Sequence, residues 1–161
     1  MDDFEKFYNL ALRFLSYRPR SEKEVKDKLK VQSSKFKVEN PTAIIEKVIQ
    51  KLKEYKFIDD VEFAKKWIES RLRFKPRSLR LIKMELKQKG IDPEIINNLQ
   101  LTINSDLESA KKLVEKRIER LKGLDKQKVY EKLGRFLASK GFNWDTIKKS
   151  IDPIKGQDGD F

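Results

Sequence analysis

The first third of this chain is repeated 57 residues further along the sequence. Residues 17–21 (YRPRS) return as residues 74–78 (FKPRS), and the register between the two copies is unbroken. Three apolar positions of the first copy also fall on apolar positions of the second: Leu15 on Leu72, Val25 on Ile82 and Leu29 on Leu86. A match that keeps apolar positions, turn residues and register together indicates a duplicated structural unit, so the chain is expected to fold as stacked repeats.

The first copy begins with two helices separated by a proline. Asp2 or Asp3 supplies a side-chain acceptor for the first free amides of a helix, and apolar residues follow at helical spacing. Pro19 ends this helix because the residue before a proline is pushed out of the helical conformation. Ser21 then caps a second helix, and Glu24 three residues later completes a capping box.

A third helix of the first copy is expected after a polar connection. Residues 32–39 are polar apart from Phe36 and Val38, and they are expected to link the helices. Asn40 then serves as the N-cap, and Pro41 occupies the first turn, where its missing N–H costs nothing. The first unit is therefore expected to contain three helices.

Two further units follow the same scheme. Ser78 caps the second helix of the second unit, which stops at Gly90, a residue that tolerates the left-handed conformation beyond a helix end. The third unit begins near Ser105 and is more diverged. The predicted fold is all-α: three tandem three-helix repeats stacked into an elongated array, whose curvature depends on the angle between repeats. The repeats are placed at residues 1–58, 59–104 and 105–153. Residues 154–161 have too little apolar surface to bury and are expected to form a flexible tail.

The composition excludes much enzyme chemistry. The chain contains no cysteine and no histidine, which removes disulfides, thiolate nucleophiles, imidazole bases and the usual zinc ligands. Its six glycines are scattered and form no phosphate-binding loop. We therefore predict a protein that is not an enzyme and has no cofactor or metal. No apolar run approaches the roughly 18 residues of a membrane span, and the acidic start at Asp2 and Asp3 is unlike a signal peptide. A cytoplasmic monomer with no membrane partner is expected.

Positive charge is concentrated in one segment. The chain has 38 Lys and Arg against 26 Asp and Glu, a net charge of +12 that attracts polyanions or an acidic protein surface. Residues 65–89 contain ten basic and two acidic residues, which gives +8 of that total. Arg80, Lys83 and Lys87 recur three and four residues apart and therefore share a helix face. The predicted partner-binding or nucleic-acid-binding residues are Arg71, Arg73, Lys75, Arg77, Arg80, Lys83, Lys87 and Lys89. A solvated, lysine-rich surface is the alternative.

Two other charged groups have simpler interpretations. A second basic stretch, residues 111–122, is interleaved with Glu115 and Glu119, which favours ion pairing within a helix. Asp59 and Asp60 suggest a metal site, but two acids at a helix start are explained by capping and by the helix dipole. Neither group therefore competes with residues 65–89 as the candidate site.

The segments described above, taken in order, resemble the RecX family of bacterial recombinase regulators across all three units. In the first unit the resemblance is carried by Ala11, Leu15, Arg18, Ser21, Val25 and Leu29. The start of the second unit contributes residues 57–60 (FIDD) followed by Phe63 and Ala64. The rest of that unit contributes Ile68, Arg71, Ile82, residues 85–87 (ELK) and residues 89–91 (KGI). The third unit closes with residues 140–142 (KGF) and Ile147. The order and spacing of these pieces are more specific than any one of them.

The resemblance implies a small helical protein that binds the RecA recombinase filament along its groove and restrains strand exchange and linked activities. The sequence departs from the family at Ser78 and Lys56, where the family often carries glycine. Lys56 disfavours a left-handed helix end at that position. Two alternatives stay open. One is a stand-alone basic helical protein that binds single- or double-stranded DNA. The other is a metal-dependent nuclease, suggested by residues 85–87, although no upstream acid on a strand is present.

Overall fold

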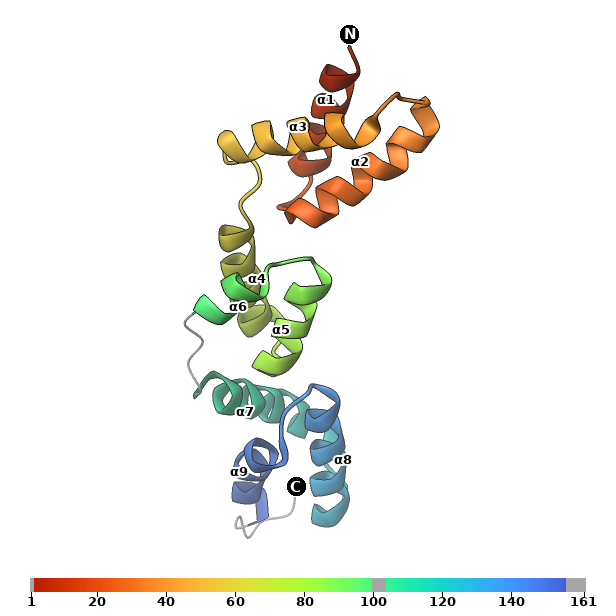
Figure 1. The fold of residues 1–161 in the computed structure, drawn as a ribbon. Helices are drawn as coiled ribbons and strands as arrows, with labels where there is room; N and C mark the ends of the chain where they lie inside the picture. Colours follow the sequence, from red (N-terminus) through yellow and green to blue (C-terminus); the bar gives the residue numbers. More distant parts are fainter. Residues whose placement is uncertain (1, 100–103, 156–161) are drawn as a thin grey trace. The chain divides into compact units, whose positions relative to one another are not determined.

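The computed structural model describes residues 2–99 and 104–155, and within these two ranges every regular element is a helix (Figure 1). In chain order the helices are α1 (Asp3–Ser16), α2 (Glu22–Phe36), α3 (Pro41–Glu54), α4 (Asp60–Phe74), α5 (Leu79–Gln88), α6 (Pro93–Asn98), α7 (Asn104–Ile118), the 3₁₀ helix η1 (Glu119–Leu121), α8 (Lys126–Ser139) and α9 (Trp144–Lys155). The prediction of an all-α fold built from three-helix repeats is confirmed. No helix in the described part of the chain is long and apolar enough to cross a membrane.

Tertiary contacts divide the chain into two compact units, and the second predicted repeat contributes to both. The first unit contains the chain up to Lys66 together with Leu86–Asn98, and the second contains Trp67–Glu85 together with the chain from Leu99 onward. The division therefore falls inside α4 and α5 rather than between helices. The repeat boundaries at residues 58 and 104 stay a prediction, as does the elongated form of the array.

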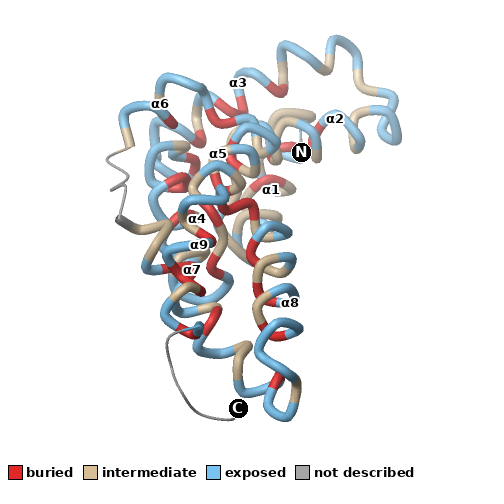
Figure 2. The backbone as a smooth tube through the Cα atoms, turned by 90° about the horizontal axis from the view of Figure 1, so that it is seen from below, coloured by how far each residue is buried: buried red, intermediate tan, exposed pale blue. Residues whose placement is uncertain are grey.

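Each unit has its own apolar core (Figure 2). The first core consists of Phe7, Ala11, Val25, Leu29, Ile45, Val48, Ile49, Leu52 and Ile58. The second consists of Ala110, Val114, Leu121, Val129, Leu133, Leu137, Phe142, Ile147, Ile151 and Ile154. In both units the buried residues recur at helical spacing on the inner faces of three helices, as expected for units too small to fill a thick core.

The end of α9 corrects the predicted tail. Ile154 and Lys155 belong to α9, and Ile154 is buried in the second core. The tail predicted for residues 154–161 is therefore wrong at its first two positions, because Ile154 joins the core that contains Ile147 and Ile151, seven and three residues earlier in the same helix. Residues 156–161 lie outside the described part of the chain.

The start of α3 and the connection before it also differ from the prediction. Helix α2 continues through Phe36, whose ring lies edge-on to Phe7 at a centroid distance of 6.4 Å. The polar connection predicted from residue 32 is therefore shorter, because this aromatic contact favours a longer helix. Asn40 is the N-cap as predicted, but it has a φ of +49° and its side chain makes no capping bond. Lys56 adopts a φ of +57°, so the left-handed turn forms there without glycine.

The other helix starts behave as predicted. Asp2 accepts a hydrogen bond from the Glu5 amide at 2.7 Å, and Asp59 accepts one from the Glu62 amide at 3.0 Å. Ser21 and Glu24 form the reciprocal capping box. Such caps are typically worth about 1 kcal/mol each, so they fix helix boundaries more than they stabilise the whole fold.

Within the first unit, the start of α2 is bound by residues of the next repeat, an arrangement named here the first junction. The Ser21 hydroxyl donates to the Lys89 carbonyl at 2.6 Å, and the Glu22 amide donates to the Asp60 carboxylate at 2.8 Å. Gly90, with a φ of +77°, lies against Lys23 so closely that an added Cβ would be 2.5 Å from the Lys23 Cβ. Burial raises the pKa of Asp60, with the Glu22 and Asp59 charges contributing and the Glu22 amide opposing.

The second unit contains the same arrangement at the start of α5, named here the second junction. The Ser78 amide donates to the Lys140 carbonyl at 3.0 Å, and the Leu79 amide donates to the Asp106 carboxylate at 2.8 Å. Gly141, with a φ of +86°, lies against Ser78 and Leu81. The repetition therefore includes the contacts between one repeat and the next as well as the helices themselves. Asp60 serves the first junction rather than capping its own helix.

Candidate partner-binding surface

Three of the eight predicted binding residues are engaged inside the protein. In the second unit, Glu85 accepts hydrogen bonds from the Trp67 indole at 2.8 Å and from the Arg71 Nε at 2.7 Å. The same carboxylate forms an ion pair with the Nη1 of Arg77. The Arg71 guanidinium also lies over the Trp67 ring, 4.4 Å from its centroid. We call this group the Glu85 clamp.

The clamp keeps Glu85 ionised. Burial opposes ionisation, but hydrogen bonds from Arg71 and Trp67, together with the charges of Arg71 and Arg77, outweigh it and hold the pKa of Glu85 below its usual value. Both oxygens of Glu85 are engaged by donors of the protein itself. The described residues contain no group of three or more His, Cys, Asp or Glu side chains placed to hold a metal.

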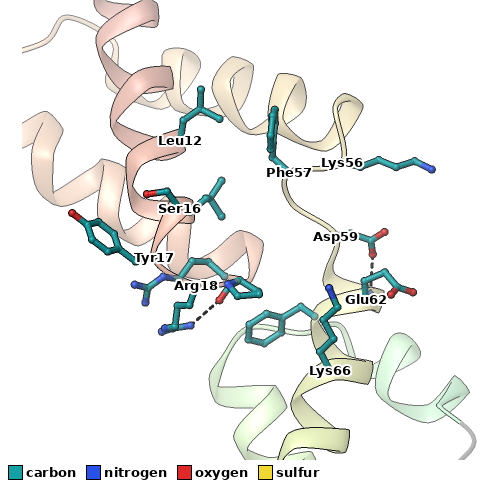
Figure 3. A pocket seen from close by; sticks show the side chains of 13 residues that line it. Leu12, Ser16, Tyr17, Arg18, Lys56, Phe57, Asp59, Glu62 and Lys66 are labelled. Carbon is teal, nitrogen blue, oxygen red and sulfur yellow. Dashed lines mark hydrogen bonds between the residues drawn. The ribbon is translucent and has the colours of Figure 1, made fainter.

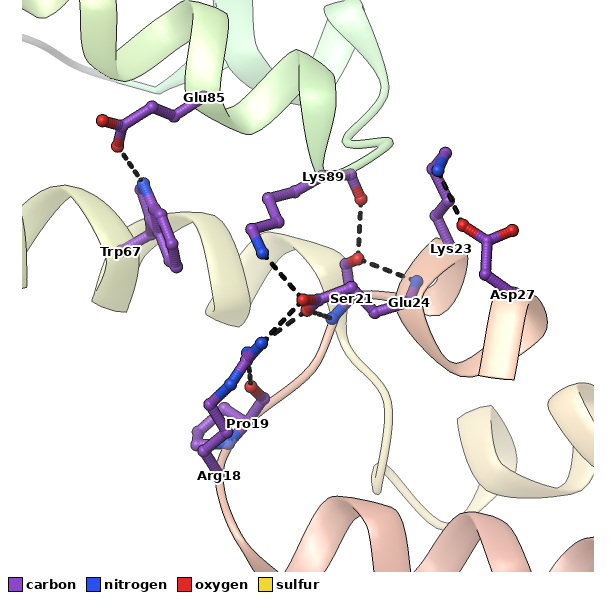
Figure 4. A network of polar contacts seen from close by, with 9 residues as sticks. All are labelled: Arg18, Pro19, Ser21, Lys23, Glu24, Asp27, Trp67, Glu85 and Lys89. Carbon is purple, nitrogen blue, oxygen red and sulfur yellow. Dashed lines mark hydrogen bonds and ion pairs between the residues drawn. The ribbon is translucent and has the colours of Figure 1, made fainter. Parts of the chain in front are cut away.

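Lys89 is engaged in the first junction (Figure 4). Its ammonium lies 2.8 Å from Glu24, which also accepts from the Arg18 guanidinium at 2.7 Å and from the Ser21 amide at 3.2 Å. Burial opposes ionisation of Glu24, but these hydrogen bonds and the Arg18 charge lower its pKa to about 2. Arg71, Arg77 and Lys89 are therefore structural cations rather than free binding groups.

The other five predicted residues keep their charges uncommitted. Arg73, Lys75, Arg80 and Lys87 are exposed and Lys83 is half-buried. None of the five forms an ion pair with a residue that the structure describes. Arg73 and Lys75 stand at the end of α4, and Arg80 and Lys83 are in the first two turns of α5. Lys87 is one turn further along α5, in the segment that packs with the first unit.

Exposed apolar side chains accompany these cations in the second unit. The ring of Phe74 is 67% exposed and is covered on one face by the Arg73 guanidinium, 5.0 Å from the ring centroid. Met84, next to Lys83, is 46% exposed. We define the α4–α5 surface as Arg73, Phe74, Lys75, Arg80 and Lys83.

The second basic stretch follows its prediction only in part. Glu119 pairs with Lys122 at 2.5 Å, as expected for a solvated helical surface. Glu115 forms no ion pair with any described residue, and Arg117 lies over the Phe136 ring instead, 4.9 Å from its centroid.

The sequence interpretation missed a hollow of about 610 Å³ in the first unit (Figure 3). It is lined by the end of α1, the segment between α3 and α4, and the first turns of α4. Tyr17 and Phe57, which come from two of these segments, are 72% and 52% exposed. Both are aromatic residues next to polar helix ends. This position was the only feature of the sequence that could have indicated that they are exposed.

Comparison with known proteins identifies the class of this helical repeat protein. Models of the first, second and third three-helix domains of RecX match residues 8–32, 59–98 and 104–151, in chain order. The regulatory protein RecX of Clostridium tetani is 38% identical over 98% of this chain and 71% of its own length. That of Bacillus velezensis is 33% identical over 99% of this chain, which spans 59% of the relative.

Solved structures agree with the sequence comparisons. The crystal structure of RecX from Lactobacillus salivarius superimposes with a TM-score of 0.77 at 29% identity, covering 96% of this chain and 97% of the other. The protein is thus a regulatory protein built from three-helix domains. It belongs to the RecX family.

Proposed function

We propose that this protein binds the RecA recombinase filament and restrains strand exchange and the activities linked to it, without catalysing a reaction. The observation that supports this most directly is the occurrence of all three RecX domains in order in one chain. The α4–α5 surface adds uncommitted cations and exposed apolar side chains, which suit contacts with a protein filament that contains DNA.

The first experiment titrates the protein into RecA-dependent strand exchange and into the DNA-dependent ATPase reaction of RecA. We expect both rates to fall as the protein approaches stoichiometric amounts. Unchanged rates at and above stoichiometric protein would contradict the proposal.

A charge-reversal series then tests the surface. The triple variant Arg73→Glu, Arg80→Glu, Lys83→Glu is expected to bind filaments about tenfold more weakly or worse, because attractive contacts become repulsive. Arg77 is left unchanged, since its reversal would break the Glu85 clamp and confuse binding with folding. Filament binding is measured by co-sedimentation, and helicity by circular dichroism.

The matched control carries the same charge change elsewhere in the second unit: Lys132→Glu, Arg135→Glu, Lys148→Glu. These residues are exposed, and both triple variants lower the net charge from +12 to +6. Equal losses in the two variants would mean that binding follows net charge and not the α4–α5 surface.

A stand-alone DNA-binding role is the second candidate, supported by the same cations. It predicts affinity for DNA without RecA that falls steeply with salt, in proportion to the number of phosphates contacted. Filament binding that persists at a salt concentration abolishing DNA binding would favour the RecA role.

A further inference from the structure

Two cations in the first unit share one aromatic ring and have no acidic partner among the residues that the structure describes. The Arg20 guanidinium lies 4.0 Å from the centroid of the Phe14 ring, and the Lys28 ammonium lies 5.6 Å from the same centroid. Neither side chain makes a hydrogen bond or ion pair with a residue that the structure describes. The Arg20 Nε is buried without an acceptor, as is the Arg77 Nε in the second repeat. Both side chains are half-buried.

Comparison with the second repeat shows which partner Arg20 and Lys28 lack. Leu10, Phe14, Arg20 and Lys28 correspond, 57 residues on, to Trp67, Arg71, Arg77 and Glu85. These four residues of the second repeat form the Glu85 clamp, in which an internal carboxylate neutralises the arginine. The first repeat keeps the arginine but has lysine at the position of the carboxylate.

The charges nearest to Arg20 do not compensate for this substitution. Burial is the main cause that lowers the pKa of the Arg20 guanidinium, and the Arg18 charge lowers it further. Glu24 opposes this shift but is itself bound by Arg18 and Lys89. Two like charges held near one ring repel each other, and an anion supplied from outside would relieve that repulsion.

The stacking on Phe14 leaves the arginine able to bind. A guanidinium over the face of an aromatic ring is attracted to the ring without using up its N–H donors. The two terminal nitrogens can then donate to the two oxygens of a carboxylate. Arg20 also lines the hollow that contains Tyr17 and Phe57, so a chain bound to it has exposed aromatic surface beside it.

We propose that Arg20 and Lys28 form a docking site for a carboxylate side chain in an acidic segment of a partner protein. The carboxylate takes the place that Glu85 occupies in the second repeat. A carboxylate is favoured over a phosphate because the second repeat closes the same framework with a glutamate. The site is separate from the α4–α5 surface, and its existence does not depend on the RecA role.

The probe is a fluorescein-labelled peptide of about twelve residues with alternating glutamate and serine, and its binding is measured by fluorescence anisotropy without RecA or DNA. Lys28→Glu supplies the internal carboxylate of the second repeat and is expected to close the site. Its affinity for the peptide falls about tenfold or more, while its Tm stays equal or rises because Arg20 gains a partner. The matched control Lys30→Glu makes the same charge change at an exposed position of α2, and its affinity falls less than about threefold.

Three results would overturn the proposal. The first is a Lys28→Glu affinity no weaker than that of the Lys30→Glu control. The second is equally tight binding of a peptide with glutamine in place of glutamate, which would mean that the aromatic hollow alone binds it. The third is an oligonucleotide that displaces the peptide and depends more strongly than the peptide on Lys28, which would assign the site to phosphate. Arg20→Gln gives an independent check, since it removes the donor without adding a carboxylate and is expected to weaken the peptide to a similar degree.

Discussion

The first and second junctions bring the same backbone elements together with different side-chain chemistry. In each, a buried serine caps a helix, an aspartate of the following repeat accepts from the first helical amide, and a Lys-Gly turn packs against the helix start. The two junctions differ three residues after the serine, where the first has Glu24 and the second has Leu81. Glu24 gathers Arg18 and Lys89 into an ionic network, whereas Leu81 packs on Gly141.

Comparison of the two junctions shows which residues are common to both and which position differs between them. A buried carboxylate is stable only with several donors, and the first junction supplies three, so removing any one leaves a costly charge. The apolar version needs only close packing. Serine, aspartate and glycine are present in both versions, because they satisfy backbone groups or leave room for the backbone. We infer that these three positions define how repeats close on one another.

The largest effect is expected from adding a methyl group to the turn glycines. In Gly141→Ala the new Cβ would lie 2.4 Å from the Leu81 Cγ and 2.5 Å from the Ser78 Oγ, at a φ of +86°. Leu81 and Ser78 are packed against the turn, so the backbone has to shift. We expect a loss of about 3 kcal/mol or more in the free energy of unfolding, measured by urea denaturation. Gly90→Ala should cost nearly as much, because the clash is with the Lys23 Cβ, which cannot move away from its helix.

Gly123→Ala is the matched control. Gly123 has a φ of +87°, but an added Cβ would meet no atom within 4 Å. It should therefore lose only the conformational cost of about 1–2 kcal/mol. Equal losses at the three glycines would mean that the junctions tolerate the methyl group and that close packing at the turns is not required.

These junctions also show why the sequence predicted some contacts and not others. The Ser21–Glu24 capping box and the stop at Gly90 were predictable because the partners are three residues apart or the signal is a single residue. The bonds from the Glu22 amide to Asp60 and from the Leu79 amide to Asp106 span 38 and 27 residues. Nothing local distinguishes an aspartate that caps its own helix from one that caps another.

The sequence did not reveal that three residues of the candidate site are paired inside the protein, for a related reason. The count of charges treated Arg71 and Arg77 as cations without an ion-pair partner. Glu85, in α5, forms ion pairs with both of them. A count records the number of charges but not their pairing. An alignment of the two repeats places Glu85 of the second at the position of Lys28 in the first. This exchange of an acid for a base indicates that an arginine paired in one repeat lacks that partner in the other.

The second prediction concerns how the stability of the first junction depends on pH. The pKa of Glu24 is lowered from 4.5 to about 2, so its stabilising contribution is complete above about pH 4.5 and is lost as the pH falls toward 2. Glu24→Gln should cost about 2 kcal/mol at pH 7 and progressively less as the pH falls. Hydrogen exchange at pH 6 and pH 3, corrected for intrinsic rates, is followed in peptides covering residues 18–30 and 74–86.

Acid should weaken protection at the start of α2 through Glu24, and in α5 through Glu85, whose pKa is also lowered. Glu24→Gln should therefore reduce the acid sensitivity of residues 18–30 and leave that of residues 74–86 unchanged. Unchanged acid sensitivity of residues 18–30 in Glu24→Gln would show that the Glu24 network does not stabilise the first junction.

The smallest predicted difference compares the two capping serines, which are 0% and 1% exposed. Ser21 uses its hydroxyl twice, as donor to the Lys89 carbonyl and as acceptor from the Glu24 amide at 3.3 Å. Ser78 contacts the Lys140 carbonyl through its backbone amide, and its hydroxyl accepts from the Leu81 amide at 3.2 Å. Ser21→Ala therefore removes the hydrogen bond to the Lys89 carbonyl, whereas Ser78→Ala keeps the backbone hydrogen bond to the Lys140 carbonyl. We expect losses of about 2 kcal/mol and about 1 kcal/mol, respectively, in urea denaturation. A larger loss in Ser78→Ala than in Ser21→Ala would mean that the hydroxyl of the second junction stabilises the protein more than the hydroxyl of the first.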